Sequence, residues 1–332
     1  MIRLVQLQRG SVRRVAVVEE PRLRLVNGFE SVYSLAQAAL SADVSFSQLI
    51  RKQVTSEAVE YDPVHRGESD WRLLAPMDHP SEPARCLVSG TGLTHLGSAK
   101  DRQAMHEKPE AELTDSMKMF RWGVEGGRPE AGKTGVAPEW FYKGNGTILR
   151  AHNEPLMVPT FAEDGGEEAE IAGVYMIDPS GQPRRVGMAM GNEFSDHKFE
   201  KRNYLNLAGS KIRTCALGPE LVIEPEFNSV AGKVNLLRDG QEFWSKEICS
   251  GESEMCHSLR NIEHHHFKFE THRRPGDVHV HYYGACSLSF GAGVQLADGD
   301  VMAIQFAGFG RALRNPISIA KGPPQLVAVT TL

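Results

Sequence analysis

The stretch EAEIAGVYMI (residues 168–177), followed by VGMAMGNEF (186–194), decides the expected fold and the expected site. Both are short apolar runs bounded by Gly, Pro and Asp, which is typical of buried strands. Residues i and i+2 of a strand point to one face, so the side chains of Glu168 and Glu170 converge. A third carboxylate, Glu193, follows the second run. Three such oxygen ligands predict a site for Mg²⁺ or Mn²⁺.

The alternative interpretation of this pattern is a solvated strand edge, because glutamate is mostly exposed in proteins. Two carboxylates side by side repel each other unless a cation or a proton lies between them. About twenty residues after Glu193, Ser210-Lys211 precedes the stretch TCALGPEL, which places a lysine near the acids in the sequence.

The chain after about residue 140 is rich in strand patterns. Asp239-Gly240 separates two apolar runs and predicts a hairpin. The best helix in this part is roughly Ser258–Glu270. Towards the N-terminus, residues 1–30 read as strands. Two helices are then predicted from apolar residues at helical spacing, at 32, 35, 36, 39 and 40 and again at 46, 49, 50 and 54. The predicted organisation is a small α+β N-terminal domain over 1–85, ending in a proline-rich linker, and a larger, mostly β domain over 86–332.

Composition narrows the class of protein. The chain has 332 residues, 41% of them hydrophobic, and a net charge of −5, so it has no basic excess for binding nucleic acid phosphates. No apolar run approaches the roughly 18 residues that a membrane helix needs, and the N-terminus shows no signal peptide. The five cysteines are few, odd in number and scattered, which favours reduced thiols over a disulfide framework. We therefore expect a cytoplasmic protein that binds neither nucleic acid nor membranes.

A phosphate-loop pattern, GRPEAGKT, occupies residues 127–134 within the Gly- and Pro-rich stretch 123–140, which is predicted to be a loop. Phosphate binding requires a buried strand before this pattern and a helix that begins at its Lys-Thr. FRWGVEG is a poor buried strand, and Pro138 disfavours the helix. We expect a loop that binds no nucleotide.

Histidines give a second possible metal site. His264, His265 and His266 are consecutive, and His279 and His281 share one face of a strand. A cupin-type metal signature would also need a glycine at position 273, which is Arg273, and a glutamate soon after His281, where Tyr-Tyr-Gly-Ala stands instead. The alternative is ordinary surface or half-buried histidines. Cys249, Cys256 and His257 lack the paired short spacing of a zinc site.

Taken in order, the motifs of the chain resemble the fumarylacetoacetate hydrolase superfamily, and within it a sugar-acid branch. The resemblance spans roughly residues 86–318 and rests on the order of the motifs, since none is specific alone. The motifs are Pro138 to Lys143 (PEWFYK), Glu168-Ala-Glu170, Asn192-Glu193, Lys211, Leu217-Gly218-Pro219, the Asp239-Gly240 hairpin, Pro275-Gly276-Asp277 and the ending from Asp298 to Asn315.

This resemblance implies an α+β, mostly β fold: a mixed β-sandwich roll of the fumarylacetoacetase C-terminal-domain type, behind the small N-terminal domain. It implies one Mg²⁺ or Mn²⁺ bound by Glu168, Glu170 and Glu193, a keto-acid substrate and a homodimer. The family usually has Asp at the third ligand position, so Glu193 is one methylene longer. Lys211 is expected beside the metal as a catalytic residue and Lys143 at the rim of the site. The expected substrate-binding residues are Lys143, Asn192, Ser98 and Ser287.

The resemblance also bears on the type of reaction, through the lid, the segment that carries the water-activating residues in the hydrolases. Hydrolases of the superfamily activate water with a His-Glu pair, whereas the matching stretch here, residues 92–99, has Ser98 at the histidine position. His95, His106 or Glu107 could substitute, although none has the expected offset. Since hydrolysis needs a base for water, we expect a lyase: the dehydration of a 2-keto-3-deoxy sugar acid, such as 2-keto-3-deoxypentonate to 2,5-dioxopentanoate, with Lys211 and Glu107 as catalytic residues. The alternatives are hydrolysis of acylpyruvates or 2,4-diketo acids, and a non-catalytic protein that binds sugar acids.

Overall fold

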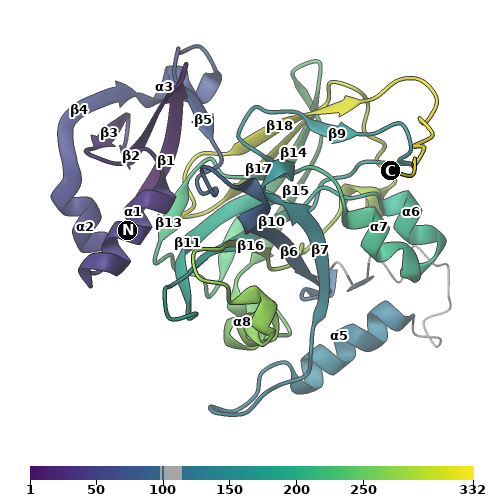
Figure 1. The fold of residues 1–332 in the computed structure, drawn as a ribbon. Coiled ribbons are helices and arrows are strands. Elements are labelled where there is room, and N and C mark those ends of the chain that lie inside the picture. Colours follow the sequence, from purple (N-terminus) through teal and green to yellow (C-terminus); the bar gives the residue numbers. More distant parts are fainter. Residues whose placement is uncertain (98, 101–113) are drawn as a thin grey trace.

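Two mixed β-sheets form the body of the protein in a computed structural model, which describes residues 1–97, 99, 100 and 114–332 (Figure 1). The larger sheet has 13 strands and contains the path β4-β3-β2-β1-β13-β11-β10-β16-β6-β7. Its strands are β1 (Ile2–Arg9), β2 (Val12–Glu19), β3 (Arg22–Val26), β4 (Val54–Glu60), β5 (Arg72–Leu74), β6 (Cys86–Gly92), β7 (Glu139–Asn145), β8 (Leu149–Arg150), β10 (Ala169–Ile177), β11 (Pro183–Asn192), β12 (Cys215–Leu217), β13 (Leu221–Ile223) and β16 (Val278–Tyr282).

The smaller sheet has five strands in the order β15-β14-β17-β18-β9. They are β9 (Leu156–Val158), β14 (Val230–Arg238), β15 (Gln241–Ser250), β17 (Val301–Phe306) and β18 (Leu313–Ile319). The described α-helices are α1 (Val32–Ala42), α2 (Phe46–Gln53), α3 (Tyr61–Arg66), α5 (Asp115–Gly126), α6 (His197–Arg202), α7 (Leu207–Lys211) and α8 (Leu259–Phe267). The expected α+β, mostly β fold is confirmed.

Local sequence signals account for several of these elements. The Ser45 side chain accepts a hydrogen bond from the Gln48 backbone N–H, and the Gln48 side chain accepts one from the Ser45 backbone N–H, which makes a capping box at the start of α2. Ser258 caps α8 in the same position, where the sequence predicts the helix to begin. The predicted hairpin joins β14 to β15, and both turn residues, Asp239 and Gly240, have positive φ angles of 52° and 77°. Such angles give a turn whose twist matches the strands.

The prediction that all of 123–140 is loop is wrong at both ends. Helix α5 continues to Gly126, and β7 begins at Glu139. The segment FRWGVEG is helical, although its two glycines weaken helix propensity, because Phe120 and Gly123 pack inward against the protein. The short helices α6 and α7 were not predicted either, since each is too brief to show a helical period.

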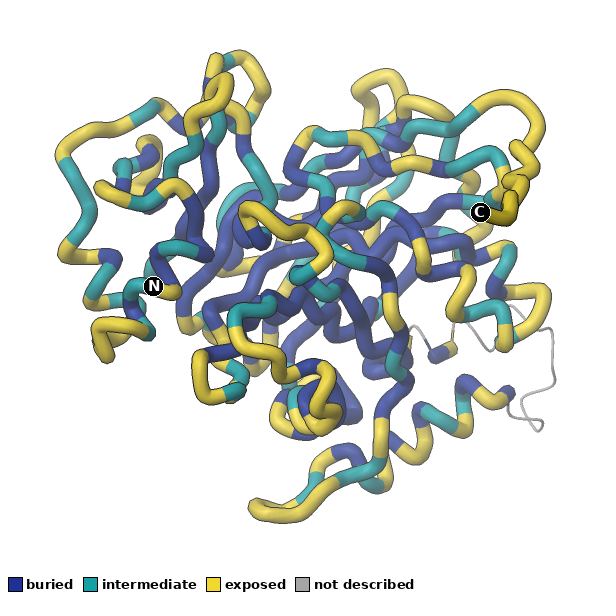
Figure 2. The backbone as a smooth tube through the Cα atoms, viewed as in Figure 1, coloured by how far each residue is buried: buried dark blue, intermediate teal, exposed yellow. Residues whose placement is uncertain are grey.

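The core lies on both faces of the larger sheet. Alternate residues of β10 and β16, among them Val174 and Val280, pack with Leu35 of α1 and Ile50 of α2. The residues between them, such as Ile171, pack instead against the smaller sheet and α8. Figure 2 shows the resulting continuous band of buried backbone through the central strands. This burial on both faces explains why β10 is apolar apart from Glu170.

The N-terminal strands continue the larger sheet, because β1 pairs with β13. The boundary after residue 85 stays a prediction. All five cysteines are free thiols. Within the described part of the chain, every helix is too short or too polar to pass through a membrane.

Candidate metal centre

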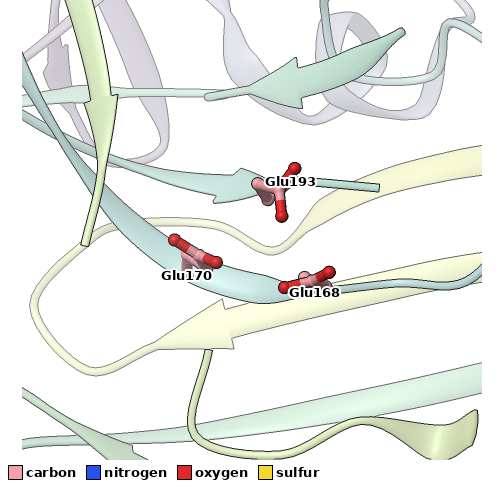
Figure 3. A group of neighbouring side chains, drawn as sticks. All are labelled: Glu168, Glu170 and Glu193. Atoms are coloured by element: carbon pink, nitrogen blue, oxygen red, sulfur yellow. The ribbon is translucent and has the colours of Figure 1, made fainter. Parts of the chain in front are cut away.

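Three glutamates meet at the end of the β10–β11 pair that lies away from its connecting turn. Antiparallel pairing sets Ala169 opposite Asn192, and the Glu193 N–H donates to the Glu168 carbonyl at 2.9 Å, which extends the ladder by one pair. Glu168 and Glu193 are therefore neighbours across the strands, and Glu170 lies two residues along on the same face. Figure 3 shows the three carboxylates gathered in this way.

The geometry of this cluster fits a divalent cation. One carboxylate oxygen from each of Glu168, Glu170 and Glu193 lies within 4.8 Å of the others, and all three residues are buried. An all-carboxylate donor set suits a hard cation such as Mg²⁺ or Mn²⁺. The family that the sequence resembles usually has Asp at the third position, and the longer side chain of Glu193 still reaches the other two acids here. The sequence prediction that the three acids converge is confirmed.

Two lysines share the site with the glutamates. The Lys211 ammonium, at the end of α7, donates to Glu168 Oε1 and Glu193 Oε2, both at 2.5 Å, and to Ser195 Oγ at 3.0 Å. Lys143, on β7, donates to Glu193 and to the Phe194 carbonyl. Both lysines are fully buried. Two ammonium groups and three carboxylates have a net formal charge of −1. A bound divalent cation would change the sign of this charge.

Burial dominates the electrostatics of the acids. It raises the pKa of Glu170 well above its usual value, and repulsion from Glu193 and Glu168 raises it further. Burial also raises the pKa of Glu193, together with repulsion from Glu168, while the ammonium groups of Lys143 and Lys211 oppose the shift. Buried acids with perturbed pKa values cluster at functional sites, which makes this group a candidate site.

The expected substrate-binding residues occupy different places. Lys143 lies inside the protein, whereas the resemblance placed it at the rim. The Asn192 side-chain oxygen accepts from the backbone N–H groups of Glu168 and Phe194, at 3.1 and 3.2 Å, so it ties the two acid-bearing segments together. Ser287 is buried and accepts a hydrogen bond from Lys246 at 2.6 Å. Ser98 and the catalytic candidate Glu107 lie outside the described residues, as does His106.

The loop that carries Ser287 is hydrogen-bonded at both ends to the segment from Glu167 to Glu170. The Gly284 N–H donates to Glu170 Oε2 at 2.7 Å. The Ser289 N–H and hydroxyl donate to the two oxygens of Glu167, at 2.8 and 2.7 Å. Glu167 was missed from the sequence because only the Glu168-x-Glu170 pair shows the alternation of a strand.

His95, one of the possible substitutes for the hydrolase histidine, has hydroxyl groups within hydrogen-bond distance of both ring nitrogens. Its Nδ1 lies 2.8 Å from the Thr94 hydroxyl and its Nε2 lies 3.4 Å from the Ser250 hydroxyl. Burial lowers the pKa of His95 to about 4. A ring with this pKa is a poor match for a general base near neutral pH.

A second histidine, His197, was not singled out from the sequence, and it lies against the metal centre. Its Nε2 is 3.1 Å from Glu168 Oε1. The one available signal was its position, four residues after Glu193. Three of the histidines that the sequence analysis considered form a separate group on the face of β16 opposite the metal centre, whereas His264 is exposed. His266, His279 and His281 are buried there rather than on the surface, and within the described residues the glutamates alone form a group able to hold a metal.

Comparison with solved structures shows that this fold is shared with known enzymes. The structure of a 2-keto-3-deoxy-D-arabinonate dehydratase complexed with magnesium and 2,5-dioxopentanoate matches with a TM-score of 0.71 and 19% identity, over 96% of this chain and 100% of the other. A 2-hydroxyhepta-2,4-diene-1,7-dioate isomerase from Mycobacterium marinum matches with a TM-score of 0.60 and 16% identity, over 96% and 99%. A 5-carboxymethyl-2-hydroxymuconate delta-isomerase from Mycobacterium smegmatis matches with a TM-score of 0.57 and 17% identity, over 96% of this chain and 100% of the other.

No protein-family model matches the chain, and no curated protein matches its sequence. The structural matches extend over nearly the whole length of both proteins. The fold that the sequence resemblance implies is thus confirmed.

Proposed function

We propose that this protein is a Mg²⁺-dependent lyase that dehydrates a 2-keto-3-deoxy sugar acid, converting 2-keto-3-deoxypentonate to 2,5-dioxopentanoate. The observation that carries the proposal is the buried group of Glu168, Glu170 and Glu193 in contact with Lys211. The fold adds support, because a dehydratase of the same fold is complexed with magnesium and 2,5-dioxopentanoate.

The metal would be held by the three glutamates, and when bound it supplies a Lewis acid for the 2-keto oxygen and the neighbouring carboxylate. The chain's own residues stabilise charge and transfer protons. Lys211 lies within hydrogen-bond distance of two of the ligands, so a keto acid bound there is within its reach. In this position its ammonium stabilises the negative charge that forms on the enolate oxygen, or its amine accepts the proton from C3.

The atoms of the reaction balance without a co-reactant. The C3 proton and the C4 hydroxyl leave as one water, and one proton from C5 and one from its hydroxyl then move to C3 and C4, which gives the aldehyde of 2,5-dioxopentanoate. The lid residue Glu107 is the proposed acid for the leaving hydroxyl. Hydrolysis of an acylpyruvate would instead need a base that activates water. His95 does not meet that need, because both its ring nitrogens are engaged and its pKa is about 4.

The test is a screen of keto acids with and without Mg²⁺, read by product mass. We expect 2-keto-3-deoxypentonate to lose the mass of one water only when the metal is present, and acylpyruvates to survive. Release of pyruvate from acylpyruvates at enzyme-like rates would favour the hydrolase. Binding of sugar acids without any turnover would favour the non-catalytic alternative.

A further inference from the structure

His197 is held in a fixed position beside one carboxylate of the metal centre. It is the first residue of α6, and the Asp196 side chain caps that helix by accepting from the Phe199 N–H. Asp196 is itself bound by the buried guanidinium of Arg213 at 3.2 Å. The backbone at His197 is therefore held in place by Asp196 and Arg213, which are not among the three glutamates of the metal centre.

The imidazole ring has little freedom to turn. Its centre lies 5.3 Å from that of Phe290, and a Cβ added to Gly166 would stand only 2.4 Å from His197 Nδ1. His197 is 2% exposed. A glycine at 166 is thus what allows the ring to lie close to the backbone there, with Nε2 aimed at Glu168.

The contact with Glu168 defines which ring nitrogen carries the proton. A carboxylate only accepts hydrogen bonds, so Nε2 donates across the 3.1 Å to Glu168 Oε1. Lys211 donates to that same oxygen. The two donors approach one oxygen from different elements, α6 and α7, so a rotation of the carboxylate would break both hydrogen bonds. Lys211 also contacts Glu193, whereas the described ion pair of His197 is with Glu168.

We propose that His197 is a positioning residue that holds the Glu168 carboxylate in the orientation needed to bind the metal. This inference rests on the proposed function, because it takes Glu168 as a metal ligand. Partners that orient a ligand in this way affect metal affinity by about 10–100-fold when they are removed. Since the effect is on orientation, a different side chain with a donor at the same reach should preserve it.

The experiment measures Mn²⁺ affinity, by the electron paramagnetic resonance signal of free Mn²⁺, on purified full-length protein. We expect His197→Leu, which keeps apolar bulk against Phe290 but has no donor, to weaken Mn²⁺ binding about 10–100-fold. His197→Gln restores an N–H donor and should recover most of the affinity. If His197→Leu does not fold, His197→Asn replaces it, since its amide is too short to reach Glu168 and the same loss is expected.

The matched control is His152→Leu. His152 is also buried, at 4% exposed, but its ring bonds the backbone of His65 and Arg314, away from the glutamates. We expect this change to lower thermal stability and leave Mn²⁺ affinity unchanged.

Two results would overturn the proposal, and they differ from a failure of the proposed function. Wild-type Mn²⁺ affinity in folded His197→Leu would show that the ring only fills space. Failure of folded His197→Gln to recover affinity would show that the N–H donor is not what matters. If the unaltered protein bound no Mn²⁺, the proposed function would fail first, and the role of His197 with it.

Discussion

At the scale of single residues, Lys211 is the side chain whose placement needs a functional explanation. A fully buried ammonium between two buried carboxylates pays a desolvation cost that apolar residues of similar volume would avoid. Its position becomes understandable if negative charge must be stabilised next to it during a reaction.

We therefore predict that Lys211→Met lowers kcat about 10²–10⁴-fold, the range associated with a positioned acid–base group. The measurement is steady-state kinetics with 2-keto-3-deoxypentonate and saturating Mg²⁺. Lys118→Met is the control, because Lys118 is an exposed lysine on α5 whose described ion pair is with Asp115 in the same helix. Equal activity of the two variants would exclude Lys211 from the chemistry.

Some residue-scale features could be predicted from the sequence and others could not. Glu168 and Glu170 follow from strand alternation alone, and Glu193 from its place after the next strand. His197 and Glu167 could not be predicted, because their roles depend on contacts with residues distant in the chain, such as Ser289, 122 positions away from Glu167. The burial of Lys143 likewise comes from packing.

At the scale of elements, the register of β10 with β11 places the site. The pairing shifts between Val174 and Tyr175, and this irregularity, which a single sequence does not reveal, helps to determine that Glu193, the residue after β11, faces Glu168. A one-residue slip would turn the acids to the opposite face. The hairpin, the two N-terminal helices and α8 were predictable because their turn and capping residues are local.

The phosphate-like loop between α5 and β7 gives a prediction at this scale. No helix begins at Lys133-Thr134: the described residues 133–138 are irregular. The Gly135 N–H donates to Asn261 of α8, and His265 contacts the Gly135 carbonyl. The backbone directly after the motif, where a phosphate-binding helix would have to begin, is thus engaged in other hydrogen bonds.

We expect calorimetric titration with Mg²⁺-ATP to show no binding to this loop. Micromolar binding that disappears in Lys133→Ala would contradict the assignment, because it would show that the loop rearranges into a phosphate site.

At the scale of the whole molecule, long-range pairing decides the architecture. The parallel pairing of β6 with β16 and the antiparallel pairing of β1 with β13 join segments about 190 and 220 residues apart, and no local pattern predicts them. The fold could be anticipated only from the order of many motifs along the chain. The group of buried histidines behind the sheet is another result of this assembly, since α8 brings His266 to within 3.0 Å of His279 on β16.

This histidine group makes part of the stability depend on pH. Burial, followed by repulsion from His272, lowers the pKa of His279 to about 3 from the 6.5 of an unperturbed ring. A lowered folded-state pKa means that the unfolded chain binds the proton more readily. The contribution of His279 to stability is therefore fully present above pH 6.5 and declines as the pH falls towards 3.

We predict that the difference in unfolding free energy between wild type and His279→Gln changes by about 1.4 kcal/mol between pH 7.5 and pH 5.5, the wild type losing more. Urea unfolding at both pH values measures it. Using the difference between the two proteins removes the opposing effect of buried acids such as Glu263, whose pKa is raised by burial. A difference that is independent of pH would contradict this account, because it would show that His279 binds a proton equally readily in the folded and the unfolded chain.

The central claim, that buried glutamates and a lysine on this fold dehydrate a keto-deoxy acid, is tested most directly by one measurement. The protein is freed of metal with EDTA, incubated with 2-keto-3-deoxypentonate before and after Mg²⁺ is restored, and the products are identified by mass, with Glu170→Gln in parallel. We predict 2,5-dioxopentanoate from the wild type only with Mg²⁺, and little from Glu170→Gln at the same Mg²⁺ concentration. Product formation that is indifferent to Mg²⁺ and to Glu170, or pyruvate as the product instead, would contradict it.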